Sequence, residues 1–409
     1  MTSSRTHRTY RTGLRAALAV AITAVAVGVT GATVAHAAEP IPPGTFTLER
    51  SSSDGAVVDA LDAALTTVTI DGVAADANRE GRTGEDCKSV LPEVTTKYCW
   101  QSDDNNTNQW WAQGVTSTYD AYGSTGVTPD GRKLLVASWY DKDQDTEEPD
   151  DGINKGARIS VLDRANAKYR HVLLAVPDGT ATSPTFRIAN THAGGLAWYG
   201  RYLYVADTDG IRVFDMGRIW RANTNIEESI GKTAAGYGAY GYKYVVPQVH
   251  RYAGQDTFRY SSVAVDRTTS PDTLVATEYR TPGDTSQASP RTIRYDLNET
   301  TKLVAEDSSG VAGADGAWTI GVDSLQGGVF VNGRLYLSQS DGESRIFDGD
   351  RGDVYRYTPS SGSLVRWGNH LPVGTEDFSY WSGLDELWTT AEYPGLRGLY
   401  ALDYGYYSR

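Results

Sequence analysis

Polar side chains that could bind or transform a ligand recur at five points along the chain, each followed by small and apolar residues. In chain order they are Gln113, His192, Tyr260 with Ser261, Gln326, and Glu376 with Asp377. If a repeated fold brings them together, they form a ring of hydrogen-bond donors and acceptors in which His192 can act as acid, base or metal ligand. The alternative is that they only line a solvated channel.

A second set of residues pairs a carboxylate with an aromatic ring. The segments TEYRTPG (277–283) and AEYPG (391–395) share this pattern, which sets Glu278 beside Tyr279 and Glu392 beside Tyr393. A carboxylate can bond sugar hydroxyls while the apolar body of a ring covers the C–H face of a pyranose. The pattern therefore favours carbohydrate recognition, although the same pairs would also serve to cap the edge of a neighbouring sheet.

Catalysis is the alternative to simple binding. The sequence contains no nucleophile elbow, zinc-protease helix, phosphate loop or Gly-rich dinucleotide turn. A polysaccharide hydrolase or lyase would here use His192 and Glu376 as its acid–base pair. Two carboxylates separated by about 5 to 10 Å across an open funnel would favour a glycosidase, whereas a funnel plugged by aromatic rings would not.

One acidic segment invites a comparison with calcium sites. Asp141, Asp143 and Asp145 alternate with other residues and are followed by further acids. The segment lacks the glycine that an EF-hand needs at its sixth position, so it is not an EF-hand loop. A solvated acidic loop is the simpler interpretation, and we expect no cofactor, with calcium as the alternative.

The elements that must position these residues are short strands in a repeated unit. Five units from residue 113 onward each contain the polar opening, a turn, a second strand and a third strand that ends near an aromatic or acidic residue. Turns such as Tyr199-Gly-Arg and Asn332-Gly-Arg supply glycine where φ is positive. Four antiparallel strands per unit predict an all-β β-propeller of five blades, with six blades or a β-sandwich as alternatives.

The ends of the chain predict how the ring closes. The fifth unit stops at Arg409 after its third strand, so its outer strand must come from elsewhere, and residues 67–71 are the candidate. Fourth strands are predicted at 169–176, 242–248, 302–306 and 364–367. A helix is predicted over 55–66, capped by Ser53 and Asp54. The expected domains are an N-terminal extension over 38–112 and the propeller over 113–409.

Residues 1–37 have the features of a secretory signal peptide. A basic start and an apolar run end in Ala35-His36-Ala37, a cleavage pattern of small residues. A membrane anchor is the alternative. Cleavage before Ala38 would remove four arginines and take the net charge from −13 to −17. This acidity disfavours nucleic acids and anionic membranes as partners, and no later segment is apolar enough for membrane insertion.

The two cysteines, Cys87 and Cys99, support the same conclusion about compartment. Neither has a further cysteine or histidine at metal-ligand spacing. In an oxidising exterior two such cysteines pair, and we expect a disulfide that closes a short loop within the extension. The predicted localisation is therefore secreted and extracellular.

The five openings and the hairpins of the Gly-Arg-Leu-Tyr type resemble those of secreted actinobacterial β-propeller proteins over residues 113–409. Some of those propellers are similar to the lectin-type components of umbrella toxin particles. The resemblance implies a non-enzymatic, lectin-like protein that recognises a glycan or cell-surface polymer. The alternatives are the hydrolase or lyase described above and an interaction scaffold for other secreted proteins.

Overall fold

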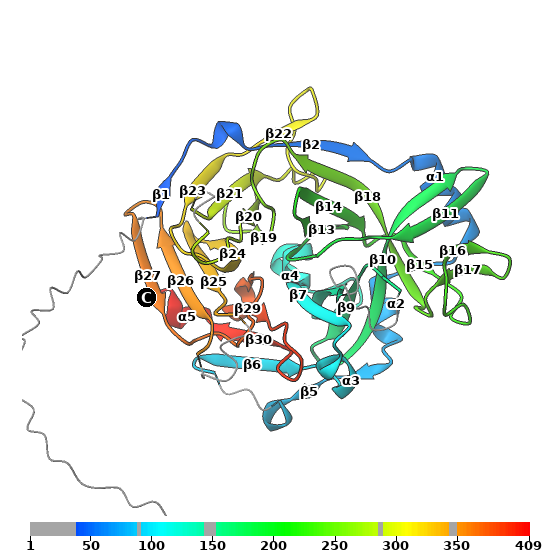
Figure 1. The fold of residues 1–409 in the computed structure, drawn as a ribbon, viewed down its shortest axis with the longest axis horizontal. Helices are drawn as coiled ribbons and strands as arrows, with labels where there is room; N and C mark the ends of the chain where they lie inside the picture. Colours follow the sequence, from blue (N-terminus) through cyan, green and yellow to red (C-terminus); the bar gives the residue numbers. More distant parts are fainter. Residues whose placement is uncertain (1–37, 88–90, 143–152, 285–288, 343–349) are drawn as a thin grey trace, which may run out of the picture. The chain divides into compact units, whose positions relative to one another are not determined.

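Four-stranded antiparallel runs are the repeating element of the fold (Figure 1). The computed structural model describes residues 38–87, 91–142, 153–284, 289–342 and 350–409. The predicted signal peptide lies outside the described residues. No helix in the described part of the chain is both long and apolar enough to cross a membrane.

The runs follow the predicted units. The first is β7 (Trp110–Ser117), β8 (Leu134–Asp141), β9 (Ala157–Asp163) and β10 (Lys168–Thr180). The second is β12 (Leu196–Tyr199), β13 (Tyr202–Asp207), β14 (Gly210–Asp215) and β18 (Tyr244–Gly254). The third is β19 (Ser262–Asp266), β20 (Thr273–Thr277), β21 (Arg291–Asp296) and β23 (Gly316–Thr319). The fourth is β24 (Leu325–Val331), β25 (Arg334–Gln339), β26 (Asp353–Thr358) and β27 (Ser363–Trp367). The fifth is β28 (Ser379–Trp381), β29 (Glu386–Thr390), β30 (Gly398–Asp403) and β6 (Val94–Cys99).

The first strand of each run faces a common centre (Figure 1). In the order β7, β12, β19, β24 and β28, each of these strands contacts the next, and β28 contacts β7 again. Glycine makes this approach feasible: a Cβ on Gly195 would lie 2.5 Å from the backbone nitrogen of Val263, and one on Gly327 would lie 2.6 Å from the Cα of Asp377. Antiparallel sheets arranged radially with their first strands in a closed ring make the fold an all-β β-propeller.

The number of blades stays a prediction. The segment 223–251, where a sixth blade was considered, forms the hairpin β16–β17 (Ile230–Thr233 and Gly236–Ala239) and most of β18. However, β10 and β18 also pair in parallel, with Leu173 opposite Val245, and this joins the first two runs into one fourteen-stranded sheet. Because one hydrogen-bonded sheet contains both the first and the second run, counting sheets does not give the number of blades.

The predicted source of the closing strand was wrong. Residues 67–71 do not reach the fifth run: β3 (Thr67–Val68) pairs with β15 (Ile219–Arg221), and the hydroxyl of Thr69 then accepts from the Gly72 backbone N–H to begin helix α2 (Ile70–Ala75). The outer strand of the fifth run is β6, which pairs with β30. Its Tyr98 stacks on Trp388 of β29 with ring centroids 6.0 Å apart.

One fourth strand was also placed wrongly. Residues 302–306 form no strand, and only an isolated bridge joins Leu297 to Val304. The fourth position of the third run is taken by β23, which lies further along the chain and pairs with β21. Its Trp318 packs against Phe330 of the next run, with ring centroids 4.9 Å apart, so the later segment offers the larger apolar contact.

The extension pairs with outer strands of the ring and contains one disulfide. Helix α1 (Gly55–Ala64) confirms the predicted helix: the Asp54 carboxylate caps it, and Val57, Val58 and Leu61 are buried. Cys87 and Cys99 are bonded, as predicted. The other elements of the extension are β1 (Glu39–Pro40), η1 (Pro43–Thr45), β2 (Thr47–Ser52), β4 (Arg79–Glu80), β5 (Arg82–Thr83), η2 (Gly84–Asp86) and α3 (Ser102–Asn106).

The connections within the ring carry short elements. They are α4 (Thr118–Tyr122), η3 (Gly123–Thr125), β11 (Ser183–Ile188), β22 (Val311–Gly313), η6 (Ser382–Leu384) and α5 (Tyr404–Tyr407). The apolar core lies between neighbouring sheets and is rich in rings. Trp139, Trp198 and Trp388, each fully buried, are examples.

Candidate functional site

A cavity of about 510 Å³ opens where the first strands of the five runs begin. Residues from every run line it, and they include seven of the nine predicted binding residues: Gln113, His192, Tyr260, Tyr279, Gln326, Glu376 and Glu392. The remaining two, Glu278 and Tyr393, do not line the cavity. We call this cavity the axial cavity.

Irregular strand geometry aims two of the lining side chains. The pairing of β7 with β8 shifts register between Ala112 and Val115, which leaves Gln113 in a bulge. A matching shift in β24 isolates Gln326. A β-bulge removes a residue from the ladder and redirects its side chain, which is why bulges occur beside functional sites. The sequence signal was the Gln-Gly pair in both openings.

Glu376 and Glu392 form a carboxyl pair at the cavity wall. Glu376 is 3% exposed and its side chain is hydrogen-bonded to that of Glu392. Burial, and then the nearby charges of Glu392 and Asp377, raise the pKa of Glu376 well above its usual value. Burial also raises the pKa of Glu392 to about 7. The pair therefore retains at least one proton around neutral pH.

Neighbouring groups hold Glu392 in place. The side-chain amide of Gln113 donates to its carboxylate oxygen Oε2 over 3.1 Å. The turn that carries Glu392 is tied to the extension, because the buried Arg397 guanidinium donates to the carbonyl of Glu392 and, over 2.6 Å, to that of Thr107. The Gly395 N–H donates to the Asn105 carbonyl in helix α3 over 2.7 Å. The extension thus shapes one wall of the axial cavity.

Rings and an exposed cation complete the lining. The His192 ring lies over Tyr140, with centroids 4.1 Å apart, and His192 is exposed to the cavity. Tyr279 is half-buried, whereas Arg259 is exposed. Neither Arg259 nor Tyr140 was among the binding residues predicted from the sequence. Arg259 directly precedes the predicted Tyr260, so its position in the repeat was the available signal.

Beneath the cavity lining, two buried carboxylates, those of Asp377 and Asp120, bond groups on the inner strands and so join these strands to each other. The fully buried Asp377 accepts from the backbone N–H of Val115 at 3.2 Å and of Leu196 at 2.9 Å. Burial raises its pKa well above the usual value. Asp120 accepts from the hydroxyl groups of Thr116 and Ser379, and burial raises its pKa to about 6. Asp377, grouped with Glu376 at the fifth opening, therefore has structural partners on β7 and β12.

Glu278 is paired with an arginine, and the side chain of the buried Tyr393 is hydrogen-bonded to Glu392. The Glu278 carboxylate is 4% exposed and accepts from Arg291 Nε and Nη2, each at 2.7 Å, and from the Arg259 backbone N–H. This fork-shaped ion pair uses both carboxylate oxygens. Tyr393 is buried, and its ring packs edge-on against Trp111 with centroids 5.7 Å apart. Tyr260 lines the cavity, but its hydroxyl is hydrogen-bonded to that of Tyr295.

The proposed calcium segment has little support. Asp141 is buried and accepts from the Lys155 backbone N–H at 2.9 Å, so it closes the loop that follows β8. Asp143 and Asp145 lie outside the described residues. Within the described ranges, no group of three or more His, Cys, Asp or Glu side chains is arranged to hold a metal ion.

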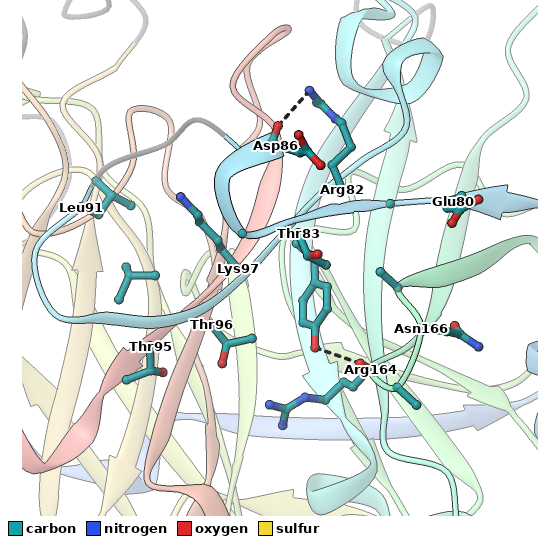
Figure 2. Close-up of a pocket in the computed structure, with 16 residues that line it drawn as sticks. Glu80, Arg82, Thr83, Asp86, Leu91, Thr95, Thr96, Lys97, Arg164 and Asn166 are labelled. Atoms are coloured by element: carbon teal, nitrogen blue, oxygen red, sulfur yellow. Dashed lines mark hydrogen bonds between the residues drawn. The ribbon is translucent and has the colours of Figure 1, made fainter.

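A larger groove of about 910 Å³ lies at the outer edge of the fifth run. Figure 2 shows its lining, drawn from β5, β6 and the turn around Arg164. The Tyr98 hydroxyl crosses the groove to donate to the Arg164 carbonyl at 3.2 Å, and Arg82 donates to the Asp86 carbonyl. These groups bond each other, and none of the predicted site residues lies there.

Comparisons with known proteins assign the chain to no family: no family model and no curated protein match it. Among solved structures, it is similar to the Cps50 (Swd1) β-propeller domain of Myceliophteria thermophila, at 8% identity and a TM-score of 0.37 over 76% of this chain and 99% of that one. It is also similar to the GH43_1 enzyme from Xanthomonas citri, at 12% identity and a TM-score of 0.33 over 85% and 92%. A third similar structure is a glutaminyl cyclase from Myxococcus xanthus, at 13% identity and a TM-score of 0.26 over 57% of this chain and 91% of that one. At these levels, the neighbours identify neither a ligand nor a reaction.

The geometry limits the chemistry of the axial cavity. Glu376 and Glu392 are hydrogen-bonded to each other, so neither a sugar nor a water lies between them as in the separated carboxylate pair of a glycosidase. What the cavity offers instead is a ring of amide, hydroxyl, imidazole and protonated carboxyl groups, together with the half-buried ring of Tyr279. Such a lining can bond hydroxyl groups from several directions.

Proposed function

We propose that the chain is a secreted binding protein whose axial cavity recognises a glycan or another polyhydroxylated cell-surface polymer. The observation that carries this proposal is the lining of the cavity, in which all five runs contribute polar groups and the two carboxyls share a proton. A protonated pair can donate as well as accept, so it suits sugar hydroxyls, which need both. Tyr279 supplies a half-buried ring beside them.

Secretion is part of the same proposal. The described chain contains a disulfide, and disulfides persist in oxidising compartments. The amino-terminal sequence has the pattern of a signal peptide. Mass spectrometry of the protein from culture supernatant tests this, with an amino terminus at Ala38 as the expected result and retention of residues 1–37 in cells as the contrary one.

The binding test starts with a glycan array and continues by calorimetry with the best ligand. We expect Gln326→Ala and Tyr279→Ala each to weaken binding about tenfold, since each removes a polar contact or a ring contact worth about 1 kcal/mol or more. Gln255→Ala is the matched control, because Gln255 is exposed and lies outside the cavity lining. Absence of any glycan ligand, or equal affinity in all variants, contradicts the proposal.

A second candidate function is a polysaccharide hydrolase or lyase. The observation in its favour is that Glu392, with a pKa of about 7, lines the same cavity as His192, and a group that titrates near the working pH suits acid–base chemistry. Product release from a polysaccharide panel, abolished by His192→Ala and by Glu376→Gln, would establish it. The absence of turnover on the ligand that binds most tightly would exclude it.

A further inference from the structure

A second cavity, of about 430 Å³, lies away from the axis, where the extension meets the first two runs. The cations that line it are Arg79, Lys155, Arg158, Arg170 and Lys243. Among its described lining residues, exposed Glu227 is the one acid. We call this cavity the basic pocket. It concentrates positive charge in a chain whose net charge is −13.

The acids behind the basic pocket neutralise it only in part. Asp104 accepts from Arg158 at 3.1 Å and also contacts Arg79 at 3.1 Å. Asp76 accepts from Lys243 at 2.7 Å and lies 3.6 Å from Arg170. Each aspartate is therefore shared by two cations. The four cations that contact Asp104 and Asp76 exceed these two aspartates and Glu227 together by one charge.

Arg158 is the most constrained of these cations. It is 4% exposed, and its guanidinium centre lies 4.2 Å from the centre of the Trp110 ring. Its Nη1 donates to the Tyr242 hydroxyl at 2.9 Å, and its Nε has no acceptor among the described residues. A guanidinium fixed in this way keeps its charge at the pocket wall, and its planar fork is the geometry that suits oxyanions.

The electrostatic environment agrees with a positive pocket. His171 lines it, donates from Nε2 to Asp104 over 3.0 Å and bonds Ser160 through Nδ1. Burial and then the charge of Arg158 lower the pKa of His171 to about 3, in spite of Asp104. His171 is therefore neutral at physiological pH and adds no charge to the count. The buried hydroxyl of Ser160 is occupied by His171 and by Trp139, so this trio is not exposed for nucleophilic chemistry.

We propose that the basic pocket binds an oxyanion, which is a carboxylate, sulfate or phosphate, carried on a sugar ring. The cations supply the charge and the fork-shaped donors. Tyr242 and Trp110 lie edge to face, with centroids 6.2 Å apart, and form an aromatic wall for the ring. The volume lies within the range of about 300 to 1,000 Å³ typical of small-molecule sites.

The competing explanation is that the cations only fasten the extension to the ring. Asp76 and Asp104 both belong to the extension, and their ion pairs with Lys243 and Arg158 do join the two parts. That role needs one cation per acid. It does not account for the second cation at each aspartate, which are Arg79 at Asp104 and Arg170 at Asp76, since like charges repel at short distance.

The test measures binding of four ligands built on one ring: glucose, glucuronate, glucose 6-sulfate and glucose 6-phosphate. Calorimetry on the purified chain at low salt would compare the parent protein with the double variant Lys155→Gln/Lys243→Gln. Both lysines are half-buried, and Arg158 is left intact so that its buried contacts persist. Lys302→Gln is the control, because Lys302 is a half-buried lysine over the Tyr199 ring and lies outside the pocket.

We expect at least one charged sugar to bind about tenfold more tightly than glucose, and the double variant to lose most of that preference. Added NaCl should weaken the binding because the charges are partly exposed. The single variant Lys243→Arg, which keeps the charge, should bind about as tightly as the parent, whereas the single variant Lys243→Gln should bind more weakly. The three charged ligands identify which oxyanion is preferred.

Three results would overturn the proposal. They are equal binding of glucose and its charged derivatives, unchanged preference in the double variant, and no binding of any of the four ligands. In each case the cations would be left with the fastening role, which circular dichroism and thermal melting of the double variant would register as reduced stability. Gln326→Ala, in the axial cavity, should leave oxyanion binding intact, so failure of the proposed function and failure of this inference are distinguishable.

Discussion

Replacing Glu392 by glutamine should change how the stability of the protein depends on pH. Glu392 shares a hydrogen bond with buried Glu376, and burial raises the Glu392 pKa to about 7 from an ordinary value of 4.5. Between these two pH values the folded chain retains a proton that the unfolded chain releases. The resulting stabilisation is complete below about pH 4.5 and is lost as the pH rises through about 7.

The size of the effect follows from the shift. A rise of the pKa from 4.5 to about 7, at about 1.4 kcal/mol per pH unit, sets an upper limit of about 3.5 kcal/mol on the change in the free energy of unfolding, which Glu392 shares with Glu376. For a chain of this length, that corresponds to a change of about 4 °C in the melting temperature. Glutamine at 392 keeps a hydrogen-bonding group of the same size without the charge, and it also relieves the repulsion felt by Glu376. The variant should therefore be more stable than the parent at pH 8 by up to about this amount, with little difference at pH 5.

The assay is thermal and guanidinium unfolding of both proteins at pH 5, 6, 7 and 8. Glu278→Gln is the control, because Glu278 is a buried glutamate whose charge is matched by Arg291. Its loss leaves a partly buried guanidinium without a counter-charge, so this variant should be destabilised at neutral pH. If the profiles of Glu392→Gln and the parent run parallel from pH 5 to 8, the carboxyl pair does not titrate as argued.

Two further predictions concern the framework. Cys87→Ser/Cys99→Ser should lose about 3 kcal/mol of stability, since the bond closes a short loop, and unchanged denaturant midpoints with and without reductant would contradict this. Gly195→Ala should prevent folding or lower the melting temperature strongly, because its Cβ would lie 2.5 Å from the Val263 nitrogen. Gly313→Ala, whose Cβ would meet nothing within 4 Å, should melt like the parent; equal melting of both alanine variants would refute the steric argument.

Most of the repeat could be predicted because its signals are local. A strand, a turn with glycine at positive φ and a second strand are set by neighbours in sequence, as at Gly200 and Gly333. The small residues of the openings also had a discoverable cause, which is the close approach of the inner strands at Gly195 and Gly327. The same pattern placed polar residues such as Gln113 and Gln326 at equivalent points of the ring.

What could not be predicted depends on partners distant in sequence. Glu278 and Glu392 occupy almost identical local motifs, yet one is neutralised by Arg291 and the other shares a proton with Glu376. The closing strand is a similar case: residues 67–71 alternate polar and apolar residues as a strand would, whereas β6 (VTTKYC) does not. It is nevertheless β6 that pairs with β30 and stacks its Tyr98 on Trp388. The basic pocket could not be predicted from local sequence either, because its cations come from four separate segments of the chain.

The two proposed sites should respond to conditions in opposite ways. The axial cavity places its carboxyls where burial holds protons, so a rise in pH above about 7 adds negative charge there and would weaken any anionic ligand. The charge of the basic pocket comes from arginines and lysines, and its one histidine stays neutral because its pKa is about 3. This charge is therefore constant across the same pH range, whereas salt screens it. A charged glycan that bound in the axial cavity would therefore lose affinity with pH, and one that bound in the basic pocket would lose it with ionic strength. Measuring the affinity of one ligand as a function of pH and of ionic strength therefore assigns it to one of the two sites without a further substitution.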